Sequence, residues 1–191
     1  MRCLLCEKLS FSHICPKCQN TFLTPSIYRR KIINDIEVIS FYRYDDIKEL
    51  LHTKHTDLGY YMYSLLAKNS FKKFASEFTY PHVINSIAVD DHVKNGYSHT
   101  AILNKALKSK NIKPLFNKLR AKNRVSYSGK SREFRLLNPR DFEVKNLKKT
   151  ELVLVDDIVT TSLTFTQAIH ELEKNNNKIL FCLSLADASI K

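Results

Sequence analysis

The sequence has 191 residues, enough for one ordinary domain with a small appendage and too few for two full-size domains. No apolar run approaches the roughly 18–20 residues that a membrane-spanning helix needs, which excludes such a helix. The 31 lysines and arginines exceed the 19 aspartates and glutamates, and the net charge of +12 favours polyanionic partners such as nucleic acid, anionic lipid or phosphorylated metabolites.

Four of the five cysteines lie near the start of the chain as two Cys-x-x-Cys pairs, Cys3 with Cys6 and Cys15 with Cys18. Two such pairs can supply four thiolates to one tetrahedral ion, a ligand set typical of structural zinc. A segment this short cannot build a stable core alone, so metal ligation would supply most of its folding free energy. We expect residues 1–26 to form a zinc knuckle.

The compartment follows from the first residues of the chain, where Cys3, Cys6 and Glu7 interrupt any apolar stretch of the kind a signal peptide needs. We therefore expect a cytoplasmic protein. Cytoplasmic thiols stay reduced, which disfavours two disulfides in the knuckle; an iron–sulfur cluster is the other alternative to zinc. The fifth cysteine, Cys182, lies in a buried-strand pattern and is expected to be an inert core thiol.

The remaining chain, residues 27–191, alternates strand-like and helix-like segments. Strands are expected at 36–44, 83–89, 112–116, 151–155 and 178–186, and helices at 45–51, 57–68, 97–108 and 162–173. This alternation predicts an α/β fold with a largely parallel sheet. Between 119 and 144 the pattern gives way to polar and basic residues, where we expect a mobile loop or flap.

The excess positive charge is concentrated between residues 105 and 149, which carry 15 lysines and arginines against three acids. A solvated, lysine-rich surface is one interpretation, and a functional anion-binding surface is the other. A smaller basic run beside an aromatic ring, Tyr28 to Lys31, follows the knuckle and could face a single strand of nucleic acid. The candidate contacts are Lys17, Arg29, Arg30, Lys31, Arg120, Lys122, Arg124, Lys130 and Arg132.

The chemistry centres on residues 152–164, where a buried strand ends in Asp156-Asp157 and a hydroxyl-rich turn leads into a helix. In a parallel sheet such a junction lies at the carboxyl edge, where ligands usually bind. A phosphate there would meet the N–H groups at the helix start, and the two acids could accept hydrogen bonds from ribose hydroxyls. An ordinary helix cap with two solvated acids is the alternative.

The segment from Val153 to Thr164 resembles the phosphoribosyl pyrophosphate (PRPP) motif of type I phosphoribosyltransferases. Together with the four-cysteine knuckle, it makes nearly the whole chain resemble the ComF family, competence proteins required for DNA uptake in natural transformation. The resemblance implies a phosphoribosyltransferase-like, Rossmann-type sheet that binds PRPP with Mg²⁺. It implies that the PRPP-binding residues are Asp156, Asp157, Val159, Thr160, Thr161, Ser162, Leu163 and Thr164.

The same resemblance implies single-stranded DNA and uptake machinery such as a helicase as partners, with a position in the cytoplasm or at the inner face of the cytoplasmic membrane. An active phosphoribosyltransferase of nucleotide metabolism and a PRPP-sensing adaptor remain alternatives. No general base or nucleobase-recognition element stands out in the sequence.

The chain departs from the family pattern at three places. The turn glycine is replaced by Ser162, which alters the loop if that position requires a positive φ. A Val-Pro-Val-Pro strand end is reduced to Ile87-Ala88-Val89-Asp90-Asp91, and an Arg-Gly-Tyr/Phe-Asn stretch to Asn95-Gly96-Tyr97-Ser98. The segment from Val89 to His92, which touches pyrophosphate in related transferases, is acidic here, so we expect PRPP binding rather than efficient turnover.

Overall fold

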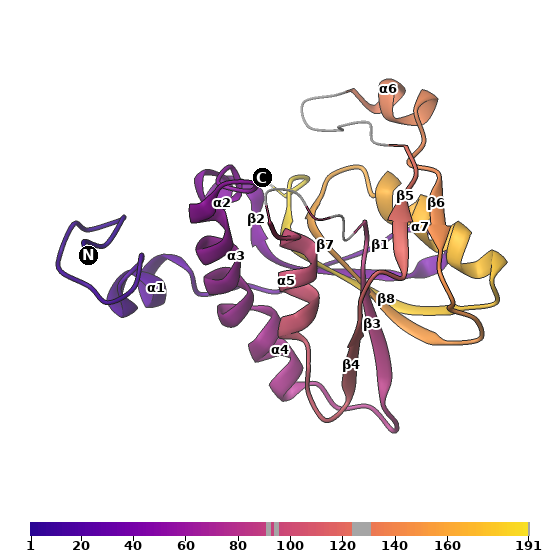
Figure 1. Ribbon diagram of the computed structural model, residues 1–191, viewed down its shortest axis with the longest axis horizontal. Coiled ribbons are helices and arrows are strands. Elements are labelled where there is room, and N and C mark those ends of the chain that lie inside the picture. The colour runs from indigo at the N-terminus through magenta and orange to yellow at the C-terminus, as the bar shows by residue number, and fades with distance from the viewer. Residues whose placement is uncertain (91–92, 94–95, 124–130, 191) are drawn as a thin grey trace.

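The computed structural model of the chain describes residues 1–90, 93, 96–123 and 131–190. Its main sheet consists of β1 (Tyr28–Lys31), β2 (Glu37–Arg43), β3 (Ile84–Ala88), β4 (Ile112–Leu115), β7 (Glu151–Val159) and β8 (Lys178–Asp187). The spatial order is β1-β2-β8-β7-β3-β4 (Figure 1). The pair β1–β2 is antiparallel and the other four pairs are parallel. The expected α/β fold with a largely parallel sheet is confirmed.

Helices cover both faces of this sheet. Figure 1 shows one group of helices on one side and a single helix on the other. The group is α2 (Tyr44–Leu51), α3 (Asp57–Asn69), α4 (Phe71–Glu77) and α5 (His99–Ala106), and the single helix is α7 (Leu163–Lys174). None of the helices within the described ranges is long and apolar enough to cross a membrane.

Strand β7 shows how the sheet separates two hydrophobic cores. Val153 and Val155 belong to the core beneath α2–α5, whereas Leu152 and Leu154 belong to the core beneath α7. Successive side chains of a strand point to opposite faces, so a continuously apolar sequence feeds both cores at once. Cys182 is buried in the α7 core, as expected, and burial raises the pKa of its thiol.

Strand β7 is longer than the sequence predicted. It continues to Val159, and Asp156 pairs with Ser184 of β8 in the register. The prediction that the strand ends before the two acids is wrong, because pairing with the ten-residue strand β8 keeps this stretch extended. The two acids are therefore held at fixed strand positions.

The other expected strands and helices are present with boundaries shifted by a few residues. Strand β1 and helix α4 were not predicted. The β1 sequence is a basic run without an apolar face, and α4 follows α3 with only Ser70 between them and no proline or glycine to mark a break.

The segment between 119 and 144 differs from the expected loop or flap at both of its ends. These ends form an antiparallel pair, β5 (Leu119–Ala121) and β6 (Phe142–Val144), whose first residues are buried in the α7 core. The prediction of a mobile loop or flap in place of a core element is wrong at these two ends, because the buried Leu119 and Phe142 anchor the pair in the core. Helix α6 (Arg132–Leu137) lies between these strands in the chain, and residues 124–130 lie outside the described residues.

The N-terminal segment contains one short helix, α1 (Pro16–Phe22), and projects at one end of the molecule in Figure 1. It is fastened to the main sheet just before β1. The Tyr42 hydroxyl donates to the Leu23 carbonyl over 2.8 Å, and the Ser26 N–H donates to the Phe41 carbonyl over 2.9 Å. Leu23 itself is buried in the α2–α5 core. A boundary between domains at residues 26 and 27 stays a prediction.

Candidate functional site

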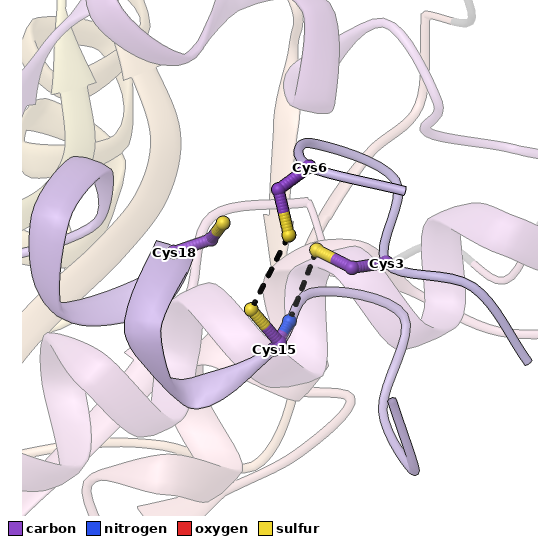
Figure 2. A group of neighbouring side chains, drawn as sticks. All are labelled: Cys3, Cys6, Cys15 and Cys18. Atoms are coloured by element: carbon purple, nitrogen blue, oxygen red, sulfur yellow. Dashed lines mark hydrogen bonds between the residues drawn. The ribbon is translucent and has the colours of Figure 1, made fainter. Parts of the chain in front are cut away.

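The four N-terminal cysteines converge on one point. Their sulfur atoms all lie within 4.8 Å of one another, and Figure 2 shows the four side chains directed toward a common centre. Cys3 and Cys18 are buried, and Cys6 and Cys15 are partly buried. All four are free thiols, with 3.8 Å between the Cys6 and Cys15 sulfurs. The cluster is positioned to bind a metal ion.

Local backbone structure explains this convergence. Cys15 caps the N-terminus of α1, Pro16 occupies the first helical position, and Cys18 follows within the first turn. The Cys15 N–H donates to the Cys3 sulfur over 3.3 Å. This hydrogen bond lowers the pKa of Cys3 to about 6, whereas burial raises the pKa of Cys18 to about 12. Four sulfur donors at this spacing fit a tetrahedral thiolate site, in which the metal charge would favour four thiolates.

The second candidate site lies at the carboxyl edge of the sheet, around Asp156 and Asp157. Both side chains are largely buried, with 9% and 7% of each residue exposed. Each carboxyl accepts the N–H of the following residue, from Asp157 and Ile158 respectively, over 2.8 Å. The two side chains point to opposite faces because they are adjacent in a strand. Their surroundings are consequently different.

Asp157 faces the α2–α5 side and lies at the centre of a polar cluster. Its Oδ2 lies 3.3 Å from Lys54 Nζ and 3.3 Å from His99 Nε2, and it accepts the Tyr63 hydroxyl over 3.2 Å. Burial alone would raise the pKa of Asp157, but the charges of Lys54 and His99 outweigh burial and hold it well below the ordinary value. Asp157 is therefore the ionised member of the pair.

Asp156 faces the α7 side, where no comparable group of donors among the described residues compensates for its burial. Burial, followed by the negative charge of Asp157, raises the pKa of Asp156 well above the ordinary value, against a smaller opposing effect of Arg140. Burial thus favours the neutral form of Asp156, whereas the neighbouring donors favour the charged form of Asp157.

The hydroxyl-rich loop follows directly. Val159 ends β7, Thr160 and Thr161 form the turn, and Ser162 stands immediately before α7 with φ +63° and ψ 4°. The turn position therefore has the left-handed conformation that glycine adopts most easily, and serine adopts it at a cost of about 1–2 kcal/mol. Leu163 and Thr164 begin α7, whose N–H groups face the loop end.

Asp90 lies two residues after the end of β3. Asp90 has φ +57°. Its carboxylate accepts the Ala121 N–H over 3.1 Å and pairs with Arg140 over 2.8 Å, so it ties the end of β3 to the β5–β6 pair. The acidity of this segment is thus compensated within the protein at Asp90. Asp91, His92 and Asn95 lie outside the described residues.

The predicted nucleic-acid contacts occupy different environments. Lys17 is exposed on α1. The side chain of Lys122 is 58% exposed, and its Nζ lies 4.0 Å from Asp141 Oδ2. Arg29 and Lys31 are exposed partners of Glu37 and Asp35. Arg30 pairs with Asp187, and Arg120 donates to Asn117. Arg132 begins α6, whereas Arg124 and Lys130 lie outside the described residues.

Sequence reasoning did not find the partners of the two acids. Lys54 lies in the loop between α2 and α3, and His99 is the first residue of α5 after its Ser98 cap. Neither Lys54 nor His99 belongs to a recognisable sequence motif. Tyr63 carried a usable signal, because it is a hydroxyl-bearing side chain on the buried stripe of α3, where burial normally requires a hydrogen-bond partner.

The comparisons with known proteins concern the fold. No family model matches the sequence, and no curated protein matches it. Among solved structures, the chain is similar to adenine phosphoribosyl transferase from Trypanosoma brucei, with 11% identity, a TM-score of 0.43 and coverage of 90% of this chain and 79% of that one.

It is similar to orotate phosphoribosyltransferase from Mycobacterium tuberculosis, with 12% identity, a TM-score of 0.40 and coverage of 88% and 81%. It is also similar to UMP synthase from Leishmania donovani, again with 12% identity and a TM-score of 0.40. There the coverage is 88% of this chain and 30% of that one, so the chain spans less than a third of the length of that protein.

Proposed function

We propose that this protein binds PRPP at the carboxyl edge of its sheet and single-stranded DNA on its basic surface, and that it serves DNA uptake in natural transformation. The observation that carries the PRPP part is the junction of β7 with α7. Two buried acids are followed by a hydroxyl-rich turn whose Ser162 takes the left-handed conformation expected of the family's glycine.

The 5′-phosphate of PRPP would lie at the start of α7. Its charge would be met by N–H groups of the loop and first helical turn and by the hydroxyls of Thr160, Thr161 and Thr164. The helix supports this role with twelve residues and an N-terminus that lacks a side-chain cap. The ligand would replace the missing cap.

The ribose hydroxyls would face the two acids. Asp157 Oδ2 already has three donors, of which Lys54 is the most exposed, with 28% of its side chain accessible against 16% for His99. A ribose hydroxyl would displace Lys54 most easily, and the freed ammonium would then be available to the pyrophosphate. In the neutral form that its burial favours, Asp156 could both donate and accept a hydrogen bond.

Mg²⁺ would arrive with PRPP. The described carboxylates around the site fit direct ligation poorly, since Asp90 is paired with Arg140, Asp157 is paired with Lys54, and burial favours the neutral form of Asp156. The ion would thus be held mainly by PRPP oxygens and water, a common arrangement for magnesium. It would neutralise the pyrophosphate charge.

Zinc is the metal we propose for the four-cysteine cluster. All four coordination positions would be filled by sulfur, which leaves none for a substrate and makes the ion structural. The proposal that the protein works with uptake machinery such as a helicase, in the cytoplasm or at the inner membrane face, rests on the ComF resemblance.

The test of the DNA part is fluorescence anisotropy of a labelled single-stranded oligonucleotide at two salt concentrations, with and without Mg²⁺ and PRPP. We expect largely sequence-independent binding that falls steeply with salt, because each lysine or arginine contact releases a counterion. Lys17→Gln and Lys122→Gln should each weaken binding and reduce the slope of log affinity against log salt concentration by about one. Lys72→Gln is the control: Lys72 is exposed on α4, and its loss should change neither quantity.

Absence of binding at low salt would refute the DNA part and lead to a screen of nucleobases for pyrophosphate release from PRPP. Release with any base would establish an active phosphoribosyltransferase, and Asp157→Asn should then abolish it. PRPP binding without DNA binding or release would favour a PRPP-sensing adaptor.

A further inference from the structure

Arg30 occupies a position that the role of a nucleic-acid contact does not explain. It lies in β1, where the burial of side chains alternates so that Arg30 is half-buried and its neighbours Arg29 and Lys31 are exposed. Only 29% of the Arg30 side chain is accessible. Its guanidinium therefore faces the protein, on the side opposite to Arg29 and Lys31.

The guanidinium joins two parts of the carboxyl edge. Its Nε lies 2.9 Å from Asp187 Oδ2, and its NH2 group donates to the Thr160 carbonyl over 2.8 Å. Asp187 is 1% exposed and ends β8, and it also accepts the N–H and the hydroxyl of Ser189. The buried Asp187 carboxylate thus pairs by charge with one edge of the planar guanidinium, and the NH2 group of the guanidinium donates to the phosphate loop.

The contact with Thr160 constrains the loop through the geometry of the peptide bond. In a trans peptide the carbonyl oxygen and the next N–H point in opposite directions from one rigid plane. Holding the Thr160 carbonyl toward Arg30 consequently directs the Thr161 N–H to the opposite side. Ser162, the residue after Thr161, has the unfavourable positive φ. Fixing the peptide plane between Thr160 and Thr161 therefore helps to keep the loop in this conformation.

We infer that Arg30 is a positioning residue of the phosphate loop, which orders Thr160 to Ser162 for the anionic group of the ligand. This inference rests on the proposed function, because it specifies how the same PRPP site is kept in shape. It separates Arg30 from the other members of the basic run and links β1, which directly follows the N-terminal segment, to the ligand site.

The test compares Arg30→Gln with Arg43→Gln in the full-length protein. Arg43 is a matched control because it lies opposite Asp187 in the β2–β8 register and pairs with a carboxylate, yet its guanidinium donates to Asp46 rather than to the loop. Hydrogen exchange of peptides covering residues 158–165 reports loop order, and equilibrium dialysis with Mg²⁺ and PRPP reports affinity.

We expect Arg30→Gln to speed exchange of the loop amides several-fold and to weaken PRPP binding by about tenfold, the loss typical of a charge-assisted hydrogen bond. Arg43→Gln should change neither. Affinity for single-stranded DNA should fall no further in Arg30→Gln than in Arg43→Gln. Equal loop exchange in the two variants would overturn the inference, as would a selective loss of DNA binding in Arg30→Gln.

Arg30→Lys keeps the test decisive if Arg30→Gln fails to fold. A lysine retains the charge beside Asp187 but lacks the two-pronged geometry of the guanidinium, so loop exchange should still rise. Wild-type loop exchange in Arg30→Lys would contradict the inference. If the wild-type protein does not bind PRPP, the proposed function fails, while the exchange comparison still decides whether Arg30 orders the loop.

Discussion

The adjacent acids Asp156 and Asp157 should respond oppositely to the same chemical change. Asp157→Asn removes the charge that compensates Lys54, whose side chain is 28% exposed, and the carboxylate beside His99, whose side chain is 16% exposed. Breaking one partner of a buried ion pair costs about 3–5 kcal/mol. Because Lys54 keeps some access to water, we expect the lower end, about 3 kcal/mol of unfolding free energy.

Asp156→Asn is the matched control within the same strand. In the neutral form that burial favours, the Asp156 side chain resembles an amide, which has one carbonyl oxygen to accept the Asp157 N–H and one group that donates. We expect its unfolding free energy to equal or exceed that of the wild type. The comparison cancels any general effect of placing asparagine at the end of β7.

Thermal and urea denaturation at pH 7 measure this difference. For a chain of this size, about 3 kcal/mol corresponds to a melting temperature lowered by roughly 6–12 °C in Asp157→Asn. Equal destabilisation by the two substitutions, or a larger loss in Asp156→Asn, would refute the assignment of one charged and one neutral acid.

The pH dependence of stability supplies a second readout with a defined sign. Since the folded pKa of Asp157 is lowered, its stabilisation is present above its ordinary pKa near 4 and is lost as the pH falls toward the folded value. Since the folded pKa of Asp156 is raised, its contribution is present below pH 4 and is lost as the pH rises through the folded value. Each asparagine variant should lack its own part of this profile.

Three further predictions concern the metal cluster, the loop and the β5–β6 pair. Cys15→Ser should lose bound metal, measured by elemental analysis, and unfold the N-terminal segment while the circular dichroism of the α/β core persists; a wild type that is metal-free yet fully folded would argue against zinc. Ser162→Gly should raise the melting temperature by up to a few degrees, since it removes the cost of a positive φ, and a marked decrease would show that the serine hydroxyl matters more than the backbone. Arg140→Gln should leave Asp90 without its ion pair and speed proteolysis between residues 119 and 144, and unchanged cleavage would contradict the anchoring role of this pair.

The sequence predicted the elements that are determined by local patterns. Cys3, Cys6, Cys15 and Cys18 converge because short spacings can be satisfied within a few residues of backbone. The parallel sheet follows from the alternation of apolar segments. Each inference needed only residues close together in the chain.

The interactions that the sequence did not predict join residues distant in the chain. Lys54 and Asp157 are 103 positions apart, and Arg30 and Thr160 are 130 positions apart. Such pairs depend on how strands and helices pack, which no local pattern records. Arg30 also shows a missed local clue, because the alternation within β1 already separates its side chain from those of Arg29 and Lys31.

The most direct test of the central claim is equilibrium dialysis of PRPP with the wild-type protein in the presence of Mg²⁺, with ribose 5-phosphate as competitor. The account predicts saturable binding of one PRPP per chain and competition by ribose 5-phosphate, because both ligands carry the phosphate that the loop before α7 would hold. Absence of saturable binding in a folded, metal-loaded protein would contradict the claim that this junction is a PRPP site.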